Sequence, residues 1–114
     1  MSLWTGAPRG AISALVNESL PFAIERQAHG DGGRYVIDLP GGAEAEMTYR
    51  LAGGVMAIDH TLVPPAFEGR GIAAALVNRA IADARAENFK IAPICSYVAA
   101  QFQRHREWAD LLAR

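Results

Sequence analysis

A helical pattern of apolar residues dominates the middle of the chain. From residue 72 to residue 84 they recur three or four positions apart, and the polar residues Asn78, Arg79 and Asp83 fall mostly on the other face. An α-helix turns about once every ~3.6 residues, so this spacing gathers the apolar side chains on one face. The pattern predicts an amphipathic helix that begins at or just before Ile72 and ends near Asn88, which can cap a C-terminus. The apolar positions are Ile72, Ala73, Leu76, Val77, Ala80, Ile81 and Ala84.

Shorter apolar runs predict strands on the N-terminal side of this helix. Residues 44–51 alternate between apolar and polar, which is typical of a strand with one exposed face. Residues 35–39 predict another strand, and the more apolar residues 55–63 predict a central one, with glycine-containing turns between them. A further short strand is expected over residues 22–27.

After the helix, residues 90–95 predict a short strand and residues 97–106 a second helix, with Ser96 as its N-cap. A last apolar segment is expected to pack back on the sheet. This order predicts an α+β fold, in which an antiparallel meander is followed by a helical crossover to a strand that runs parallel to its partner. The residues of the last segment are Trp108, Leu111 and Leu112.

A length of 114 residues predicts one domain. We expect residues 34–114 to form it and residues 1–33 to be an N-terminal extension of unknown role. A short helix is predicted over residues 11–17 and a flexible break over residues 30–33. Trp4 is a candidate anchor on the domain or on a second subunit.

Composition and net charge limit the functions and partners that the chain can have. The net charge of −1 gives no argument for a nucleic acid or an anionic membrane as partner. The single cysteine excludes a disulfide within the chain and suits a reducing, cytoplasmic location. No apolar run approaches the ~20 residues of a membrane span. We expect a monomer or weak homodimer, without a metal.

A glycine-bracketed turn, Gly69-Arg70-Gly71, opens the main helix. The first backbone N–H groups of a helix have no partner inside it, and glycine allows a ligand to approach the backbone closely. With Arg70 and the helix dipole, the turn predicts a site for phosphate or pyrophosphate. The alternative is an ordinary strand-to-helix turn. A Rossmann fingerprint would need a third glycine where Ala74 stands, and a Walker loop would need Gly-Lys-Ser/Thr.

Three segments together carry a family resemblance: His60 to Pro65, Gly69 to Ala73, and Ile94 to Val98. They resemble the GNAT N-acetyltransferase superfamily and, within it, the small single-domain YjdJ-type subfamily. The resemblance implies a mixed, mostly antiparallel sheet with a V-shaped split between two parallel strands, helices packed on it, and acetyl-coenzyme A as co-substrate. It further implies cofactor contacts at Leu62, Val63, Glu68, Gly69, Arg70, Gly71, Ile72 and Ala73.

Cys95 is the main candidate for a catalytic residue. It is predicted where a strand ends and a helix begins, and a helix N-terminus lowers the pKa of a thiol. The thiol could accept an acetyl group and pass it on, which the subfamily resemblance supports. The alternatives are a buried cysteine that acts as a small hydrophobe, or one that only lines the acetyl pocket.

Other side chains are candidates for proton transfer or phosphate contact. The resemblance implies that Tyr97 could protonate the leaving thiolate of coenzyme A, and the alternative is a packed aromatic residue. His60 could act as a base, or be a hydrogen-bonded structural histidine. The subfamily often has Glu where this chain has Leu62. Arg70 is expected to touch phosphate, and Arg104 could reach the 3′-phosphate of coenzyme A or be a solvated helix end.

These features predict an acetyl-coenzyme-A-dependent N-acetyltransferase that acts on a small amine or on a lysine of a peptide or protein. The transfer is either direct or proceeds through an acetyl-cysteine. Two alternatives stay open from the sequence. One is a GNAT-fold module that binds coenzyme A or acyl-coenzyme A without turnover, and the other is an interaction protein that uses its first third.

Overall fold

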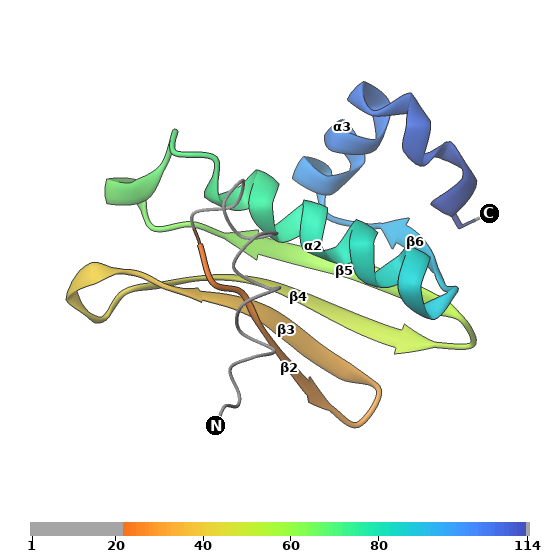
Figure 1. The fold of residues 1–114 in the computed structure, drawn as a ribbon, viewed down its shortest axis with the longest axis horizontal. Helices are drawn as coiled ribbons and strands as arrows, with labels where there is room; N and C mark the ends of the chain where they lie inside the picture. Colours follow the sequence, from red (N-terminus) through yellow and green to blue (C-terminus); the bar gives the residue numbers. More distant parts are fainter. Residues whose placement is uncertain (1–21, 114) are drawn as a thin grey trace, which may run out of the picture.

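The computed structural model describes residues 22–113, so the expectations for Trp4 and for residues 11–17 lie outside the described residues. Five strands form one sheet in the order β2-β3-β4-β5-β6 (Figure 1). The first four are antiparallel and β5 runs parallel to β6, which confirms the predicted α+β class. The strands are β2 (Glu25–His29), β3 (Gly32–Asp38), β4 (Glu44–Ala52), β5 (Val55–Leu62) and β6 (Lys90–Pro93). The helices are α2 (Ile72–Glu87) and α3 (Ser96–Arg104), with 3-10 turns η1 (Pro40–Gly42), η2 (Pro65–Phe67) and η3 (Arg106–Leu111).

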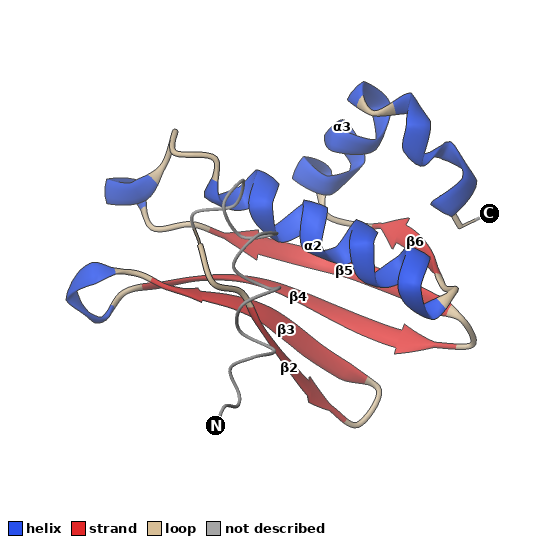
Figure 2. Cartoon of the chain, in the orientation of Figure 1, coloured by secondary structure: helices blue, strands red, loops and turns tan. Residues whose placement is uncertain are grey.

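The apolar face of α2 covers the central strands and closes the core (Figure 2). The helix begins at Ile72 as predicted, and Asn88 ends it with φ 62 and an N–H that donates to the Ala84 carbonyl. The alternation of β4 is also confirmed, because its apolar side chains are buried against α2. The largest fully buried side chains include Tyr35, Met47, Met56, Ile58, Ile72, Leu76 and Val77. In the described part of the chain, no helix combines the length and apolar character that a membrane crossing requires.

The edge strand β2 joins the sheet through β3, in a register that runs from Glu25 opposite Val36 to His29 opposite Gly32. The turn between the two strands is Gly30-Asp31, and Gly32 and Gly33 already belong to β3. The flexible break expected over residues 30–33 was therefore wrong for its second half. The division expected between residues 33 and 34 falls inside β3, and the sheet starts N-terminal to it.

Position 33 requires a glycine because the Tyr49 side chain lies directly over it and leaves no room for a Cβ. A Cβ at this position would stand 2.5 Å from the Tyr49 hydroxyl oxygen and 2.7 Å from the Gln27 carbonyl oxygen. Tyr49 is buried, so its ring has little room to move away. The absence of a side chain at Gly33 thus allows β2 and Tyr49 to close on the strand.

Gly33→Ala is expected to lower the free energy of unfolding by about 2 kcal/mol, the usual scale of overpacking a core. Urea unfolding followed by tryptophan fluorescence measures this change. Gly32→Ala is the matched control, because its Cβ would meet no atom closer than the Tyr49 carbonyl oxygen at 3.4 Å. Equal midpoints for the two variants would contradict the packing argument.

The two parallel strands separate after a short paired stretch. β5 and β6 are in register from Val55 opposite Lys90 to Ile58 opposite Pro93, and β5 then continues to Leu62 without a partner on that side. The unpaired end of β5 confirms the split that the predicted fold requires. Backbone groups in such a split are free to pair with an extended ligand.

A β-bulge lies just before the split. Tyr49 of β4 stands opposite Ile58, but the next residue, Thr48, stands opposite His60. Asp59 is therefore the extra residue on β5, and its carboxylate accepts a hydrogen bond of 2.7 Å from the Thr48 hydroxyl. One extra residue reverses which side chains of the following segment face each side of the sheet.

The bulge decides which residues at the end of β5 face α2. In a regular strand, the His60 side chain would point to the same face as that of Ile58, the inner face of the sheet that α2 covers. Instead Thr61 stands opposite the fully buried Met47, while His60 and Leu62 stand opposite residues of the outer face. The Leu62 side chain is 48% exposed, in keeping with this arrangement.

The C-terminal segment returns to the sheet edge through α3. Cys95 is the N-cap residue of α3, one position before the predicted Ser96, and the Ala99 N–H donates to its carbonyl. The last apolar segment packs back as predicted, since Trp108 and Leu111 are buried and Leu112 forms a bridge with Ile91. α3 is thereby held beside the split.

Candidate functional site

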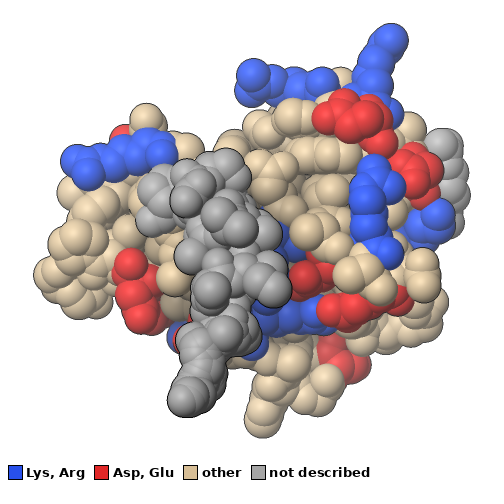
Figure 3. All heavy atoms as spheres, viewed as in Figure 1, with Lys and Arg blue, Asp and Glu red and all other residues tan. Residues whose placement is uncertain are grey.

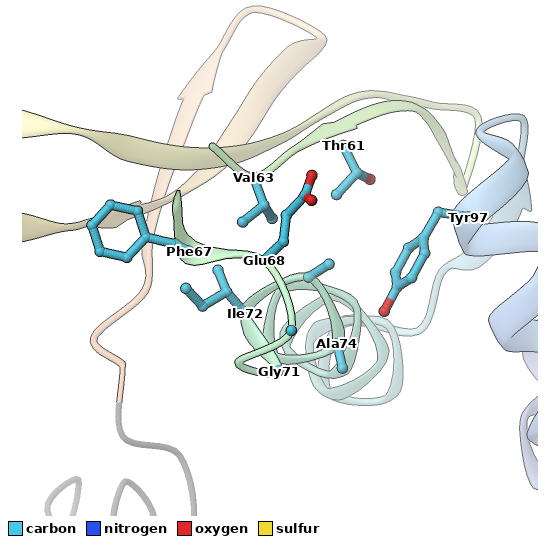
Figure 4. Close-up of a pocket in the computed structure, with 10 residues that line it drawn as sticks. Thr61, Val63, Phe67, Glu68, Gly71, Ile72, Ala74 and Tyr97 are labelled. Atoms are coloured by element: carbon cyan, nitrogen blue, oxygen red, sulfur yellow. The ribbon is translucent and has the colours of Figure 1, made fainter. Parts of the chain in front are cut away.

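A cavity of about 360 Å³ lies between the unpaired end of β5, the turn before α2, and α3 (Figure 4). Its volume is at the lower end of the range of small-molecule sites. It lies where the split and the N-terminus of α2 meet, so one extended ligand could contact both. The lining residues are Thr61, Val63, Phe67, Glu68, Gly69, Gly71, Ile72, Ala73, Ala74 and Tyr97.

The glycine turn forms one wall of the cavity. Gly69 and Gly71 adopt φ 81 and φ 80, a left-handed conformation that favours glycine, and no atom lies within 4 Å of where their Cβ atoms would stand. Gly71 is the N-cap of α2 and no side chain caps this end, so the first N–H groups of the helix stay available to a ligand. These groups and the helix dipole favour an anion at this wall.

Two charged residues belong to this part of the chain: Arg70 lies within the turn, and Glu68 directly precedes it. The Arg70 guanidinium lies 5.5 Å from the centre of the Phe67 ring, so it is placed beside the turn and outside the cavity lining. Glu68 lines the cavity, and its side chain extends toward Thr61 and Val63 (Figure 4). Elsewhere on the face seen in Figure 3, basic and acidic side chains are interspersed. Any anion selectivity therefore comes from the turn itself rather than from a broad basic surface.

Cys95 stands at the inner end of the split. Its backbone N–H donates to the Ile58 carbonyl at 2.9 Å, which ties the start of α3 to β5 at the point where the strands part. Its sulfur lies 3.7 Å from Oγ1 of Thr61, a cavity-lining residue. The thiol is therefore adjacent to the cavity and half-buried.

The surroundings of Cys95 favour the thiolate. Partial burial opposes ionisation, but the backbone N–H groups of Val98 and Tyr97 face the sulfur, and Thr61 hydrogen-bonds it. Although the sulfur forms no regular cap hydrogen bond, these groups together lower the pKa of the Cys95 thiol below its ordinary value. A thiolate at a helix N-terminus beside a cavity is a nucleophile.

Tyr97 lines the cavity from the first turn of α3, and Figure 4 shows its hydroxyl directed toward the N-terminal part of α2. Burial raises the pKa of Tyr97, and the charge of Arg104 offsets part of this effect. The phenol therefore stays protonated at neutral pH and can donate a proton or a hydrogen bond.

Besides Arg70 and Cys95, three other expected site residues do not line this cavity. His60 is exposed on the outer face, because the bulge turns it away from α2. Leu62 shares that face, so only its backbone borders the split. Arg104 lies exposed in the last turn of α3 and does not line the cavity.

The structure adds Thr61, Phe67 and Ala74 to the residues expected at the site. Phe67 and Ala74 lie close to the glycine turn in the sequence, one on each side of it, so they could have been predicted as site residues from their positions. Thr61 had no such signal, because simple alternation assigns the inner face to His60. Within residues 22–113, no three His, Cys, Asp or Glu side chains gather as ligands of a metal ion.

Comparison with known families agrees with this geometry. The sequence model of the family described as GCN5-related N-acetyl-transferase matches residues 34–111. This range covers most of β3, every element from β4 to η3, and all residues that line the cavity. No curated protein matches the chain significantly. A match over more than half of the chain, on a split mixed sheet with a glycine turn before the main helix, shows that the chain belongs to the GCN5-related N-acetyltransferase family.

Proposed function

We propose that the protein transfers an acetyl group from acetyl-coenzyme A to a primary amine, through an acetyl-cysteine at Cys95. Membership of the family suggests acetyltransferase activity. One observation supports the more specific proposal: a single cavity connects the glycine turn to Tyr97, with the Cys95 sulfur beside it. A donor held at the turn by its diphosphate would lead its thioester toward that sulfur.

The cavity suits the two chemically distinct parts of coenzyme A. The N–H groups at the start of α2 would hold the diphosphate, with Arg70 nearby as a flanking cation. The unpaired backbone at the end of β5, at Leu62 and the following Val63, would pair with the amide groups of the pantetheine arm. Arg104 has no role in the proposed binding, because it lies exposed in the last turn of α3, away from the glycine turn.

Each proposed step conserves atoms and charge. The Cys95 thiolate attacks the thioester carbonyl carbon, and its new C–S bond replaces the bond to the coenzyme A sulfur. Tyr97 donates its phenolic proton to the leaving sulfur. A neutral amine then attacks the acetyl-cysteine carbonyl, the Cys95 thiolate leaves, and the amine proton returns Tyr97 to its neutral form. A reducing compartment such as the cytoplasm would keep Cys95 available as a thiol.

The acceptor we propose is a small amine or a lysine side chain of a peptide or protein. The outer face at the split carries the acidic Asp59, beside the exposed His60 and Leu62. An acidic group near the split would attract a protonated amine before it loses its proton. This supports an amine in preference to an anionic acceptor.

Two measurements test this function. The first is the release of free coenzyme A thiol from acetyl-coenzyme A, with either a set of small amines or a lysine-containing peptide as acceptor. We expect release that depends on the amine, together with one hydroxylamine-labile acetyl group on the intact protein. Cofactor binding without either product would leave a binding module and overturn the proposal.

The second measurement locates the cofactor by calorimetric titration with coenzyme A. Gly71→Ala is expected to weaken binding about tenfold, or about 1.4 kcal/mol, since Gly71 lines the cavity and a Cβ there would hinder the close approach of the diphosphate to the backbone. Gly54→Ala is the matched control: Gly54 has a similar φ of 76 and open surroundings, but lies in the turn between β4 and β5. Equal affinities of the two variants would place the cofactor elsewhere.

A further inference from the structure

We propose that Thr61 is a positioning residue for Cys95, whose sulfur its hydroxyl holds at the inner end of the split, where β5 borders the cavity. This inference deepens the proposed function and rests on it. Thr61 belongs to neither the turn nor α3, and plain alternation along β5 would turn it away from the cavity.

The first support is the contact itself. The Cys95 sulfur and Oγ1 of Thr61 lie 3.7 Å apart, although the two residues are 34 positions apart in the sequence. Thr61 also lines the cavity, so its hydroxyl lies where the thiol and the cavity adjoin. A side chain in this place sets the direction in which the sulfur points.

The second support is the way both residues are anchored. The backbone N–H groups of Ile94 and Cys95 both donate to the Ile58 carbonyl, at 3.0 and 2.9 Å. Thr61 follows Ile58 on the same strand and is paired with Met47 of β4. The sulfur and the hydroxyl are thus fixed to one short segment of β5, and their separation does not depend on a mobile loop.

The third support is the bulge. The extra residue Asp59 brings Thr61, rather than His60, to the face shared with Met47 and α2. The Thr48 hydroxyl bonds the Asp59 carboxylate at 2.7 Å on the outer face, which stabilises the irregular register. Because of this irregular register, the Thr61 hydroxyl lies beside the Cys95 sulfur.

A hydroxyl can serve both protonation states of a thiol. The neutral S–H donates to Oγ1 of Thr61, whereas the thiolate accepts the Thr61 O–H. The Thr61 side chain and backbone are among the groups that lower the pKa of the Cys95 thiol. The titratable groups that border the cavity are Tyr97 and Glu68, while Asp59 and His60 belong to the outer side of β5.

The test compares Thr61→Val, which keeps the shape and removes the hydroxyl, with Thr61→Ser, which keeps the hydroxyl. The rate of Cys95 alkylation by iodoacetamide is measured against pH in the full-length protein without acetyl-coenzyme A. Thr61→Val is expected to raise the midpoint of this profile by about one pH unit, which means roughly tenfold slower alkylation below the midpoint. Thr61→Ser is expected to keep the midpoint near that of the wild type.

A wild-type midpoint in Thr61→Val would overturn the inference, because a purely structural role would not change the thiol pKa. Thr61→Ala is a second hydroxyl-free variant, used if valine lowers the melting temperature. In turnover with acetyl-coenzyme A and an amine, Thr61→Val should lower kcat with little change in KM for acetyl-coenzyme A. If Thr61→Val shifts the alkylation profile but the wild type transfers no acetyl group, the proposed function fails while this inference stands.

Discussion

Replacing Cys95 with alanine is expected to slow amine acetylation by roughly 100-fold or more, which corresponds to ~3 kcal/mol of activation free energy. The change removes the nucleophile but leaves the glycine turn, Val63 and Tyr97 in place. Coenzyme A binding should therefore stay within about twofold of wild type, a difference well below 1 kcal/mol. Steady-state turnover and calorimetric titration measure the two effects separately.

Ser96→Ala is the matched control for this variant. Ser96 is the exposed first residue of α3 and neither lines the cavity nor belongs to the proposed mechanism. Its turnover should match the wild type. Cys95→Ser, which keeps the size of the side chain, should still be slow because a serine hydroxyl does not ionise near neutral pH. Full turnover by Cys95→Ala would mean that the amine attacks the thioester directly.

Arg26→Ala is expected to lower the free energy of unfolding by about 3 kcal/mol, close to the scale seen when one partner of a buried ion pair is removed. Arg26 projects from β2 onto α2, where its guanidinium contacts Asp83 at 3.2 Å and Glu87 at 2.6 Å. Its Nε also donates to the Tyr49 hydroxyl at 3.1 Å. Without Arg26 these groups lose a cation in partly buried surroundings.

The neighbours of Arg26 extend this ion pair into a network that joins β2, β3 and α2. The Tyr35 hydroxyl donates to the Asp83 carboxylate at 2.8 Å, and Arg79 contacts the same carboxylate at 3.2 Å. Arg79 also donates to the Ile24 carbonyl just before β2. The network thus ties the edge strand, which precedes the family match, to the main helix.

Arg50→Ala provides the comparison, because Arg50 lies on β4 of the same sheet but is 72% exposed. Its contact with Asp31 is 3.4 Å long and also exposed. An exposed ion pair contributes little, so this variant should change the free energy of unfolding by less than about 1 kcal/mol. Urea unfolding of both variants measures the difference. Similar midpoints would show that the Arg26 network contributes no more than a surface pair.

Much of the fold followed from local patterns in the sequence. The helical spacing after Gly71 predicted α2 from Ile72 to Asn88, and the alternation at residues 44–51 predicted a half-exposed β4. Such patterns are reliable because burial against one face imposes its period on the chain. The glycine turn was predictable for the same local reason, since positive φ at Gly69 and Gly71 requires glycine.

The errors occurred where distant segments determine the local structure. Gly32 and Gly33 suggested a flexible break, yet the close approach of Tyr49 explains why Gly33 lies within β3. Ser96 was the expected cap, but the pairing of Cys95 with the Ile58 carbonyl places the start of α3 one residue earlier. No pattern within either segment reports the position of its partner.

Local patterns were enough to predict the α+β class, the main helix and the glycine turn, and to single out Cys95 and Tyr97 as candidate site residues. That Thr61, rather than His60, faces the cavity beside Cys95 could be seen only in the folded chain. The cause is the register of the strands. The side chains of a strand alternate between its faces, and one bulge at Asp59, set by pairing with β4, exchanges the face of every later residue in the strand.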